Sequence, residues 1–263
     1  MTNAAQTLTD ILDVARARTM QATLAQEPTL RAGDPLPPFF HQLYFWDPQP
    51  PGGLGRDGHP KLGGIIPDLG LPRRMWAGGR LHFKALLLAG VPARRVTRVE
   101  STARKQGRSG PLGFVTLRHE VFQGDRLALT EWQDLVYRQD PAPGTAAEPP
   151  LAPTDEDLCE TMSFDTTMLF RYSALTFNGH RIHYDLPYAT GVEGYAGLVV
   201  HGPLLAQLLI LMAERQLGRL ATFTFRATAP LMHDETATLC WKGDGSCWVR
   251  APDGRQCLTA TAG

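Results

Sequence analysis

Residues 177–204 gather groups that transfer protons and bind anions directly ahead of an apolar run. The stretch reads FNGHRIHYDLPYATGVEGYAGLVVHGPL. An imidazole with a pKa of about 6.5 accepts and returns a proton at neutral pH, so His183 is the first candidate for a general acid–base group. The Asn178 amide cannot act as a base, but it both accepts and donates a hydrogen bond and so can hold a water molecule. The two side chains predict proton transfer to and from a bound water.

The apolar run GPLLAQLLILMAE predicts a buried helix that begins at Gly202 and extends to about residue 217. The first N–H groups of a helix have no intrahelical partner, and the helix dipole adds a partial positive charge there. Gly202 permits close approach of a ligand to the backbone, and Pro203 suits the first helical turn, where its missing N–H costs nothing. We therefore expect the Gly202 backbone to stabilise an anionic oxygen.

Each of these residues also has a purely structural interpretation. His183 could be a buried histidine that only satisfies its hydrogen bonds, and Asn178 with Gly179 is also a turn dipeptide. His180 and His201 are interpreted as structural hydrogen-bonding groups. The spacing of His180, His183 and Asp185 also fits an HxxHxD metal site, although no further Cys or His at a fixed interval strengthens it, and we expect no metal. Asp185 is expected to cap the short helix that follows it.

Four arginines are candidates for binding a phosphate or carboxylate, because the guanidinium fork matches both anions. They are Arg73, Arg74, Arg171 and Arg181. Arg181 is nearest to the predicted chemistry in sequence, where it would bind a substrate carboxylate. It could equally pair with Asp185 or Glu193.

The N-terminal part of the chain predicts one helix and several strands. Residues 7–26 have an amphipathic pattern, with Thr7 and Asp10 in capping-box spacing, and predict a helix. A Pro/Gly-rich segment at about 33–80 favours turns over periodic structure. Residues 96–105, 113–122 and 126–138 alternate as antiparallel strands do, with a turn at Gly124 and Asp125.

The second part of the chain predicts the 202–217 helix followed by an antiparallel meander. Turn signals at 243–245 and 253–254 separate its last strands. The Pro/Ala-rich residues 140–155 are typical of a linker, so we predict an N-terminal domain at 1–139 and a C-terminal catalytic domain at 156–263. One helix wrapped by a curved antiparallel sheet, with the strand part repeated in the first half, predicts an α+β double hot-dog fold.

Composition excludes several other classes of protein. The chain has 263 residues with 26 Lys plus Arg and 26 Asp plus Glu, so no overall charge directs it to nucleic acid or an anionic membrane. The longest apolar run is about half of the ~20 residues that a membrane span requires. Asp10 and Asp13 precede any Lys or Arg, so we expect no secretory signal. The four cysteines lack CxxC spacing and are interpreted as reduced, buried thiols of a cytoplasmic protein.

The motif around His183 resembles the signature of the MaoC-like hydratase and dehydratase family, Asp-x-Asn-Pro-Ile-His followed by a small residue and a Gly-rich helix start. Ile182, His183, Ala189 and the His201–Gly202 pair match this pattern. The aspartate, asparagine and proline of the signature are absent, because Asn178, His180 and Arg181 occupy those positions. Asp185 and Glu193 are candidates to replace the missing carboxylate.

The fuller pattern FNxHRIHYD…YA…EGYxGLVVHGPL is similar to a subgroup that includes itaconyl-CoA and mesaconyl-C4-CoA hydratases and type 2 hydroxyacyl-thioester dehydratases. The segments DGHPKLGG, LPRRMWAGG, GRSGPLGFVTLRHE and TEWQDLVYR resemble its non-catalytic first hot dog. The resemblance implies a hydro-lyase without a cofactor that reversibly hydrates an enoyl-CoA thioester, with a short branched or dicarboxylic acyl group. His183, Asn178 and Gly202 would be catalytic, and Arg181, Arg73 and Arg74 would bind substrate.

Three alternatives stay open from the sequence. The substrate could be a straight-chain 3-hydroxyacyl thioester of fatty acid metabolism, carried by CoA or by a carrier protein. A hot-dog thioesterase usually requires a carboxylate near the start of the helix, whereas this helix has only Glu214 near its far end. Loss of the aspartate also allows a catalytically silent thioester-binding subunit. Hot-dog sheets commonly pair side by side, so the chain is either a self-contained pseudo-dimer or part of a homo-oligomer.

Overall fold

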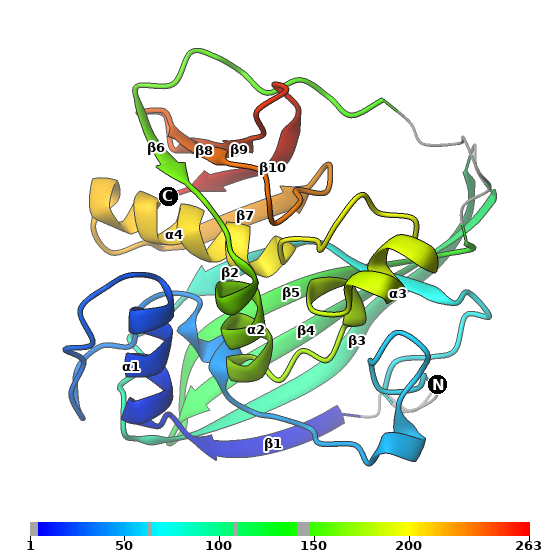
Figure 1. Ribbon diagram of the computed structural model, residues 1–263. Helices are drawn as coiled ribbons and strands as arrows, with labels where there is room; N and C mark the ends of the chain where they lie inside the picture. The colour runs from blue at the N-terminus through cyan, green and yellow to red at the C-terminus, as the bar shows by residue number, and fades with distance from the viewer. Residues whose placement is uncertain (1–4, 63–64, 108–109, 141–147) are drawn as a thin grey trace.

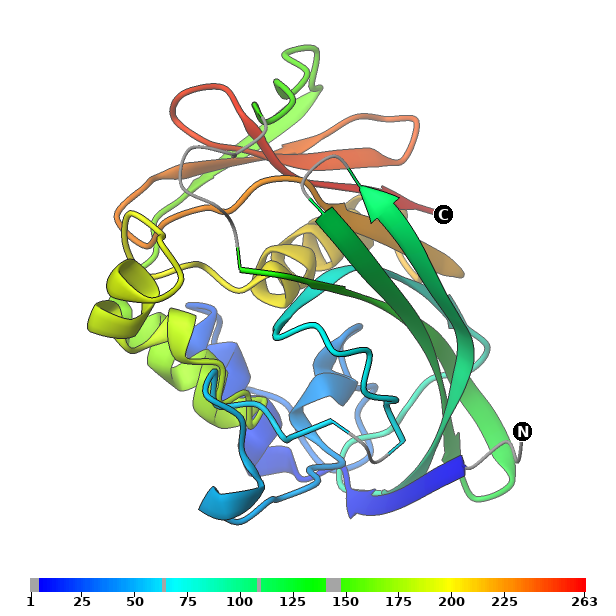
Figure 2. The same cartoon turned by 90° about the vertical axis from the view of Figure 1, so that its right-hand side faces the viewer.

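The computed structural model describes residues 5–62, 65–107, 110–140 and 148–263. Their strands form one antiparallel sheet in the order β1-β3-β4-β5-β2-β7-β10-β9-β8-β6 (Figure 1). The strands are β1 (Ala5–Ile11), β2 (Arg73–Phe83), β3 (Pro92–Gly107), β4 (Gly110–Gln123), β5 (Arg126–Arg138), β6 (Leu158–Met162), β7 (Thr222–Ala227), β8 (Ala237–Trp241), β9 (Ser246–Arg250) and β10 (Gln256–Ala262). The long strands of the first half curve along one side of the molecule, and the helices lie inside the curve (Figure 2).

The central helix is α4 (Gly202–Leu217), which begins and ends where the sequence predicts. Leu204, Leu209 and Ile210 are fully buried, and the helix packs against β8, β9 and β10 of its own half and against β2 of the other. Gly218 follows it with a φ of 75°, a left-handed conformation that favours glycine and stops the helix. The antiparallel sheet around this helix, together with the structural similarities described below, confirms the predicted α+β hot-dog fold.

The two halves of the sheet join where β2 pairs with β7, from Gly78 opposite Arg226 to His82 opposite Thr222. A Cβ atom at Gly78 would lie only 2.5 Å from the carbonyl oxygen of Phe225, so a side chain at this position would separate the strands. The Gly78–Gly79 pair therefore allows the close contact that makes one continuous sheet from two halves.

Two predicted elements are wrong in the N-terminal half. Residues 7–11 belong to strand β1, which pairs with β3, and the helix α1 (Val14–Thr23) starts later with Asp13 as its cap. Hydrogen bonding to the edge of β3 outweighed the helical pattern of the sequence. Exposure accordingly alternates along β1, as it does in a strand. The segment 33–80, for which the sequence predicts turns, also contains the start of β2 at Arg73. The prolines and glycines of the segment favoured turns over a strand.

The remaining helices are short, and all but η2 contribute residues to the wall of the candidate site. They are η1 (Phe40–Leu43), η2 (Pro51–Gly53), α2 (Thr166–Leu175), η3 (Arg181–His183) and α3 (Leu186–Gly191). Helices α1 and α2 contact each other, which brings segments from the two halves side by side (Figure 1). The strands predicted at 96–138 are confirmed as β3, β4 and β5.

The predicted linker at 140–155 includes residues 141–147, which lie outside the described residues. The division into domains at 1–139 and 156–263 therefore stays a prediction. One hydrophobic core contains buried residues from both sides of this segment, including Phe39, Leu81, Leu209 and Phe223.

Two further features concern predictions from composition. Within the described ranges, no helix has both the length and the apolar character needed to cross a membrane. Cys240, Cys247 and Cys257 are buried free thiols as expected, but Cys159 is exposed because it lies on the edge strand β6.

Candidate functional site

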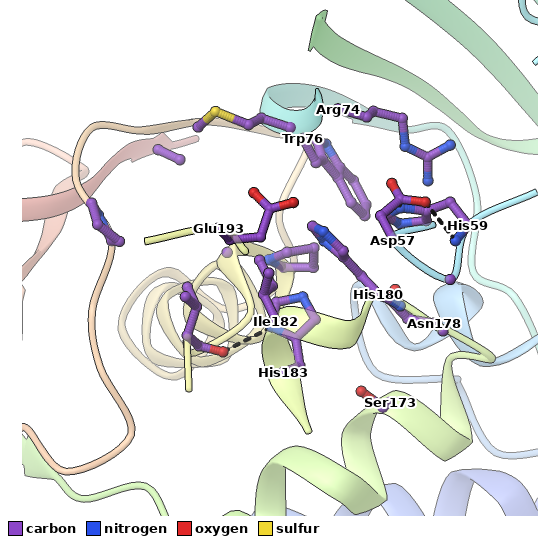
Figure 3. A pocket seen from close by; sticks show the side chains of 18 of the residues that line it. Asp57, His59, Arg74, Trp76, Ser173, Asn178, His180, Ile182, His183 and Glu193 are labelled. Carbon is purple, nitrogen blue, oxygen red and sulfur yellow. Dashed lines mark hydrogen bonds and ion pairs between the residues drawn. The ribbon is translucent and has the colours of Figure 1, made fainter. Parts of the chain in front are cut away.

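A cavity of about 1610 Å³ opens between the two halves of the chain. Its C-terminal wall comes from residues 178–180, 182–184, 199–200 and 202–203, which include the predicted catalytic residues. Its N-terminal wall comes from the loop around Asp57 and from the first residues of β2. Figure 3 shows side chains from both walls pointing toward one another across this space.

His183 lies at the end of η3 with 6% of its surface exposed. Its Nδ1 atom lies 2.7 Å from the carbonyl oxygen of Val199. A carbonyl oxygen only accepts hydrogen bonds, so Nδ1 must carry the proton and Nε2 of the neutral ring is left with its lone pair. Burial lowers the pKa of His183 to about 3, although the Val199 hydrogen bond raises it. At neutral pH His183 is therefore an uncharged imidazole with a basic nitrogen.

The ring of His201 stacks against the ring of His183. The two rings stack with centroids 3.6 Å apart, and His201 Nε2 lies 2.8 Å from the Ser173 hydroxyl of α2. His201 is fully buried, and burial holds its pKa well below the ordinary value, so it too is neutral. These contacts agree with the interpretation of His201 as a structural hydrogen-bonding group, and its ring stacks on the plane of the His183 imidazole.

Asn178 follows Phe177, whose φ of 51° turns the chain out of α2 into the loop. The Asn178 side-chain oxygen accepts a hydrogen bond from the His180 backbone N–H at 3.0 Å. This contact is the local turn that the sequence offered as the alternative to a catalytic role. The amide oxygen has a second lone pair and the NH2 group two donors, so the water-positioning role of Asn178 stays a prediction.

Gly202 is the first residue of α4 and lines the cavity. The preceding residue, His201, provides no side-chain cap, and a Cβ atom at Gly202 would meet nothing within 4 Å. The N–H groups of Leu204 and Leu205 already bond to the His201 carbonyl oxygen. The Gly202 N–H is therefore the helix-start donor placed to meet an anionic oxygen in the cavity.

Arg73 lines the cavity, but its guanidinium is already paired inside the protein. Its guanidinium forms a buried ion pair with the Glu193 carboxylate, and Tyr188 donates a hydrogen bond to the other Glu193 oxygen at 2.8 Å. Arg73 is 5% exposed, so its charge is neutralised inside the protein. A buried charge that loses its partner is strongly destabilising, which makes this pair a structural link between β2 and the loop after α3. Both oxygens of the Glu193 carboxylate are engaged by these partners, and Glu193 also lines the cavity.

Arg181 is also occupied by a partner in its own segment. Its Nε and Nη2 atoms donate to one oxygen of Asp185 at 2.9 and 2.7 Å, and its guanidinium lies over the Tyr188 ring. The other Asp185 oxygen accepts from the Tyr188 N–H, so the predicted helix cap is confirmed. The structure thus favours the predicted alternative, the Asp185 pair, over binding of a substrate carboxylate by Arg181.

Arg74 is the arginine candidate that remains directed into the cavity. It lies beside Asp57 and His59 in Figure 3, and it makes no ion pair among the described residues. Arg171 is exposed on α2 and does not line the cavity.

The loop that contains Asp57 and His59 is part of the site, which the sequence analysis missed. His59 Nδ1 lies 2.9 Å from the Asp57 carboxylate, and the His59 and His180 ring centroids are 4.5 Å apart. The Arg181 N–H donates to the Asp57 carbonyl oxygen at 2.9 Å. The only signal was the Asp-Gly-His tripeptide, an acid and an imidazole across a glycine turn, which we placed in a non-catalytic half.

The HxxHxD metal set is not assembled in this structure. His183 Nδ1 bonds to Val199, and the Asp185 carboxylate bonds to Arg181 and to the Tyr188 N–H. Within the described residues, Asp57, His59 and His180 are instead the group whose ligand atoms all lie within 4.8 Å of one another.

Comparisons with known proteins agree with this geometry. The family model for hydroxyacyl-thioester dehydratase type 2 matches residues 39–233. The chain is 43% identical over 257 residues to a mesaconyl-C(4)-CoA hydratase of Chloroflexus aurantiacus, covering 95% of this chain and 92% of that protein. HtdX of Mycobacterium tuberculosis has a similar structure, with a TM-score of 0.69 and 20% identity over 98% of this chain and 99% of the other. A second protein of that organism, described as having a double hot-dog fold, gives a TM-score of 0.61 at 15% identity and covers 100% of this chain and 95% of the other.

Gly58→Ala is expected to separate the two walls of the site. Gly58 has a φ of 87°, and a Cβ atom there would lie 2.0 Å from the Gly179 carbonyl oxygen. Hydrogen–deuterium exchange of the Arg181 amide, which bonds to the Asp57 carbonyl, should be at least about tenfold faster, the effect of losing roughly 1.4 kcal/mol of local stability. Gly70→Ala is the matched control, since Gly70 also has a positive φ but no atom would contact its Cβ. Equal exchange at Arg181 in both variants would contradict the packing of these loops.

Proposed function

Because this chain belongs to the hydroxyacyl-thioester dehydratase type 2 family, we propose that it reversibly hydrates an enoyl-CoA thioester with His183 as the general base. One observation carries the proposal: the hydrogen bond from His183 Nδ1 to the Val199 carbonyl oxygen. This bond sets the tautomer and leaves a basic Nε2 in a cavity that also holds the start of α4.

The reaction requires one proton acceptor, one proton donor and stabilisation of an enolate. His183 Nε2 takes a proton from water while the water oxygen bonds to Cβ of the enoyl group. The electron pair of the carbon–carbon double bond shifts toward the thioester oxygen, which becomes an enolate. The His183 imidazolium then returns its proton to Cα, so the ring is regenerated and one water has been added. The reverse sequence is the dehydration of a 3-hydroxyacyl thioester.

The enolate oxygen would bind at the start of α4. The Gly202 N–H donates to it, and the dipole of the 16-residue helix adds favourable electrostatic potential. Loss of one such donor typically lowers kcat about 100- to 1000-fold. The bound thioester already polarises the double bond, so we propose that no cofactor participates.

For the acyl group we propose a branched dicarboxylic chain of the mesaconyl kind. The supporting observations are the 43% identity to the mesaconyl-C(4)-CoA hydratase and the position of Arg74 on the cavity wall. Arg74 would bind the free carboxylate of such a substrate, because a guanidinium donates two parallel hydrogen bonds to a carboxylate. Addition of water would give a citramalyl-type thioester. The cytoplasmic location and a homo-oligomeric state remain part of the proposal.

His183→Gln should abolish most of the hydration activity while the protein stays folded. Removal of a general acid–base group lowers the rate about 100- to 10,000-fold, so we expect at least a 100-fold loss of kcat with mesaconyl-C4-CoA, itaconyl-CoA or crotonyl-CoA. The enoyl-thioester absorbance and the product mass give the rate and the gain of one water. His82→Gln is the control, because His82 on β2 does not line the cavity.

Two outcomes would contradict this mechanism. The first is a His183→Gln variant as fast as the wild type. The second is a wild-type protein that binds the thioesters without turnover, which would leave a silent binding subunit. Release of free CoA would indicate a thioesterase instead.

Arg74→Gln should lower kcat/KM for a dicarboxylic thioester and leave that for a monocarboxylic thioester unchanged. A hydrogen bond to a charged group contributes about 1.5–3 kcal/mol, so kcat/KM for mesaconyl-C4-CoA should fall at least about tenfold. Crotonyl-CoA has no second carboxylate and should be turned over at the wild-type rate. Arg171→Gln, an exposed position outside the cavity, is the control. An equal loss for both substrates would show that Arg74 does not bind the acyl carboxylate.

A further inference from the structure

The catalytic loop lacks a free carboxylate. Asn178 occupies the position that is aspartate in the resembling signature, and its side-chain oxygen already accepts from the His180 N–H. The two acids that follow in the same segment are also committed, Asp185 to Arg181 and Glu193 to Arg73. If a carboxylate acts beside His183, it must come from elsewhere in the chain.

Asp57 brings a carboxylate to this place from the N-terminal half. The backbones of the two loops are in contact, because a Cβ at Gly58 would lie 2.0 Å from the Gly179 carbonyl oxygen and a Cβ at Gly179 would lie 2.7 Å from that of Gly58. The Arg181 N–H also donates to the Asp57 carbonyl oxygen. The loop is therefore held against the catalytic segment by backbone contacts in addition to side chains.

A row of rings connects Asp57 to His183. The Asp57 carboxylate accepts a hydrogen bond from His59 Nδ1, and the His59 ring lies 4.5 Å from the His180 ring, centroid to centroid. The His180 ring in turn meets the His183 ring edge to face at 5.4 Å. Figure 3 shows His180 between His183 on one side and the Asp57–His59 pair on the other.

We propose that His180, held by the Asp57–His59 pair, is the second group that contacts the reacting water, and that Asp57 thereby provides the carboxylate missing at position 178. This inference rests on the proposed hydratase function. His183 Nε2 takes one proton of the water, and a ring nitrogen of His180 accepts a hydrogen bond from the other O–H. His180 is a catalytic residue in this account, whereas His59 and Asp57 are positioning residues. His180 gains and loses no proton, so the proton balance of the reaction is unchanged.

The protonation states fit this arrangement. Burial alone would raise the pKa of Asp57, but the His59 hydrogen bond and charge bring it down to about 2, so the carboxylate is ionised. Burial lowers the pKa of His59 to about 4, helped by Arg74, and that of His180 to about 2, helped by His59 and His183. At neutral pH both rings are uncharged and can accept a hydrogen bond from water.

The groups that face His180 determine how it responds to loss of Asp57. They are His59 and Asp57 of the N-terminal loop, His183 of η3 and Arg74 of β2. Asp57 is the only acid in this set and opposes the charge of Arg74. Without it, positive charge on the nearby His183 is less favourable during the reaction, so the acidic limb of the kcat/KM profile should move to lower pH.

The test compares His180→Gln and Asp57→Asn with Asp185→Asn, using whichever of the three thioesters the wild type hydrates fastest. We expect kcat to fall at least about tenfold in the first two variants with KM changed less than twofold, since a lost contact to the reacting water acts on the chemical step. Asp185→Asn keeps a helix-capping side chain and should retain the wild-type rate. Thermal unfolding checks that each variant is folded.

A second readout separates chemistry from folding. Asp57→Ala should regain activity when formate is added, because a small carboxylate can occupy the vacated space, and Asp57→Asn should show the shifted acidic limb. Wild-type rates in His180→Gln and Asp57→Asn would overturn the inference while leaving the proposed function intact. Effects on KM alone, or failure of formate to restore any activity, would also overturn it.

Two further results would count against it. Activity that EDTA removes and Zn²⁺ restores would make Asp57, His59 and His180 a metal site. A wild-type protein that hydrates none of the thioesters would remove the proposed function, and the inference that rests on it would fall as well.

Discussion

The hydrogen bond between His183 and the Val199 carbonyl oxygen is the constraint on which the rest of the site depends. The same two segments are tied a second time, because the Val199 N–H donates to the Ile182 carbonyl oxygen at 3.0 Å. This reciprocal pairing joins the catalytic turn to the strand-like segment that leads into α4. It sets the tautomer of His183 and also fixes where the Gly202 N–H lies relative to Nε2. In the proposed mechanism a base and an oxyanion donor must keep a fixed separation, and this pairing would hold both.

The candidate site is lined by residues from both halves of the chain. The pairing of β2 with β7, made possible by Gly78 and Gly79, makes one sheet of the two hot-dog halves. The buried Arg73–Glu193 pair then links β2 to the catalytic half, and the Gly58–Gly179 contact places the Asp57 loop against the histidines. Among its described residues the N-terminal half has no long central helix, and the space on the inner side of its sheet is occupied by α1, η1 and the loops that form one wall of the cavity. It therefore contributes to the site even though the sequence indicated a non-catalytic domain.

Much of this architecture could be predicted from local patterns in the sequence. The α4 helix has a continuous apolar run with glycine at both ends, and β3 to β5 alternate over many residues, so both are strong local signals. His183 could be identified because its surroundings combine a matching motif with the Gly-containing start of α4 at Gly202. The wrong predictions share one cause, which is long-range pairing. Residues 5–11 form a strand because they pair with β3 at the edge of the sheet. The start of β2 was not predicted because it contains glycines, which permit its close pairing with β7.

Among the site residues too, local sequence signals were recognised and long-range contacts were not. Arg73 and Arg181 form ion pairs with Glu193 and Asp185. The Arg73 pair joins residues far apart in the chain, which local sequence does not reveal, so their predicted substrate-binding roles stay predictions. Asp57 lies more than a hundred residues from His183, and only the folded chain brings its carboxylate to the catalytic segment. A sequence motif identifies the functional groups within one loop. Groups from distant segments, such as Asp57, are recognised only once the fold is known.

The most direct measurement of the central claim is the protonation of the His183 ring in the free protein. Long-range ¹H–¹⁵N correlation spectra of protein with ¹⁵N-labelled histidine, assigned by comparison with His183→Gln, distinguish the two nitrogens. The account predicts a protonated Nδ1 and an unprotonated Nε2 at pH 7. It also predicts that this state persists to pH 5, because burial lowers the pKa of His183 to about 3. A proton on Nε2, or a doubly protonated ring at pH 5, would contradict the assignment of His183 as the base.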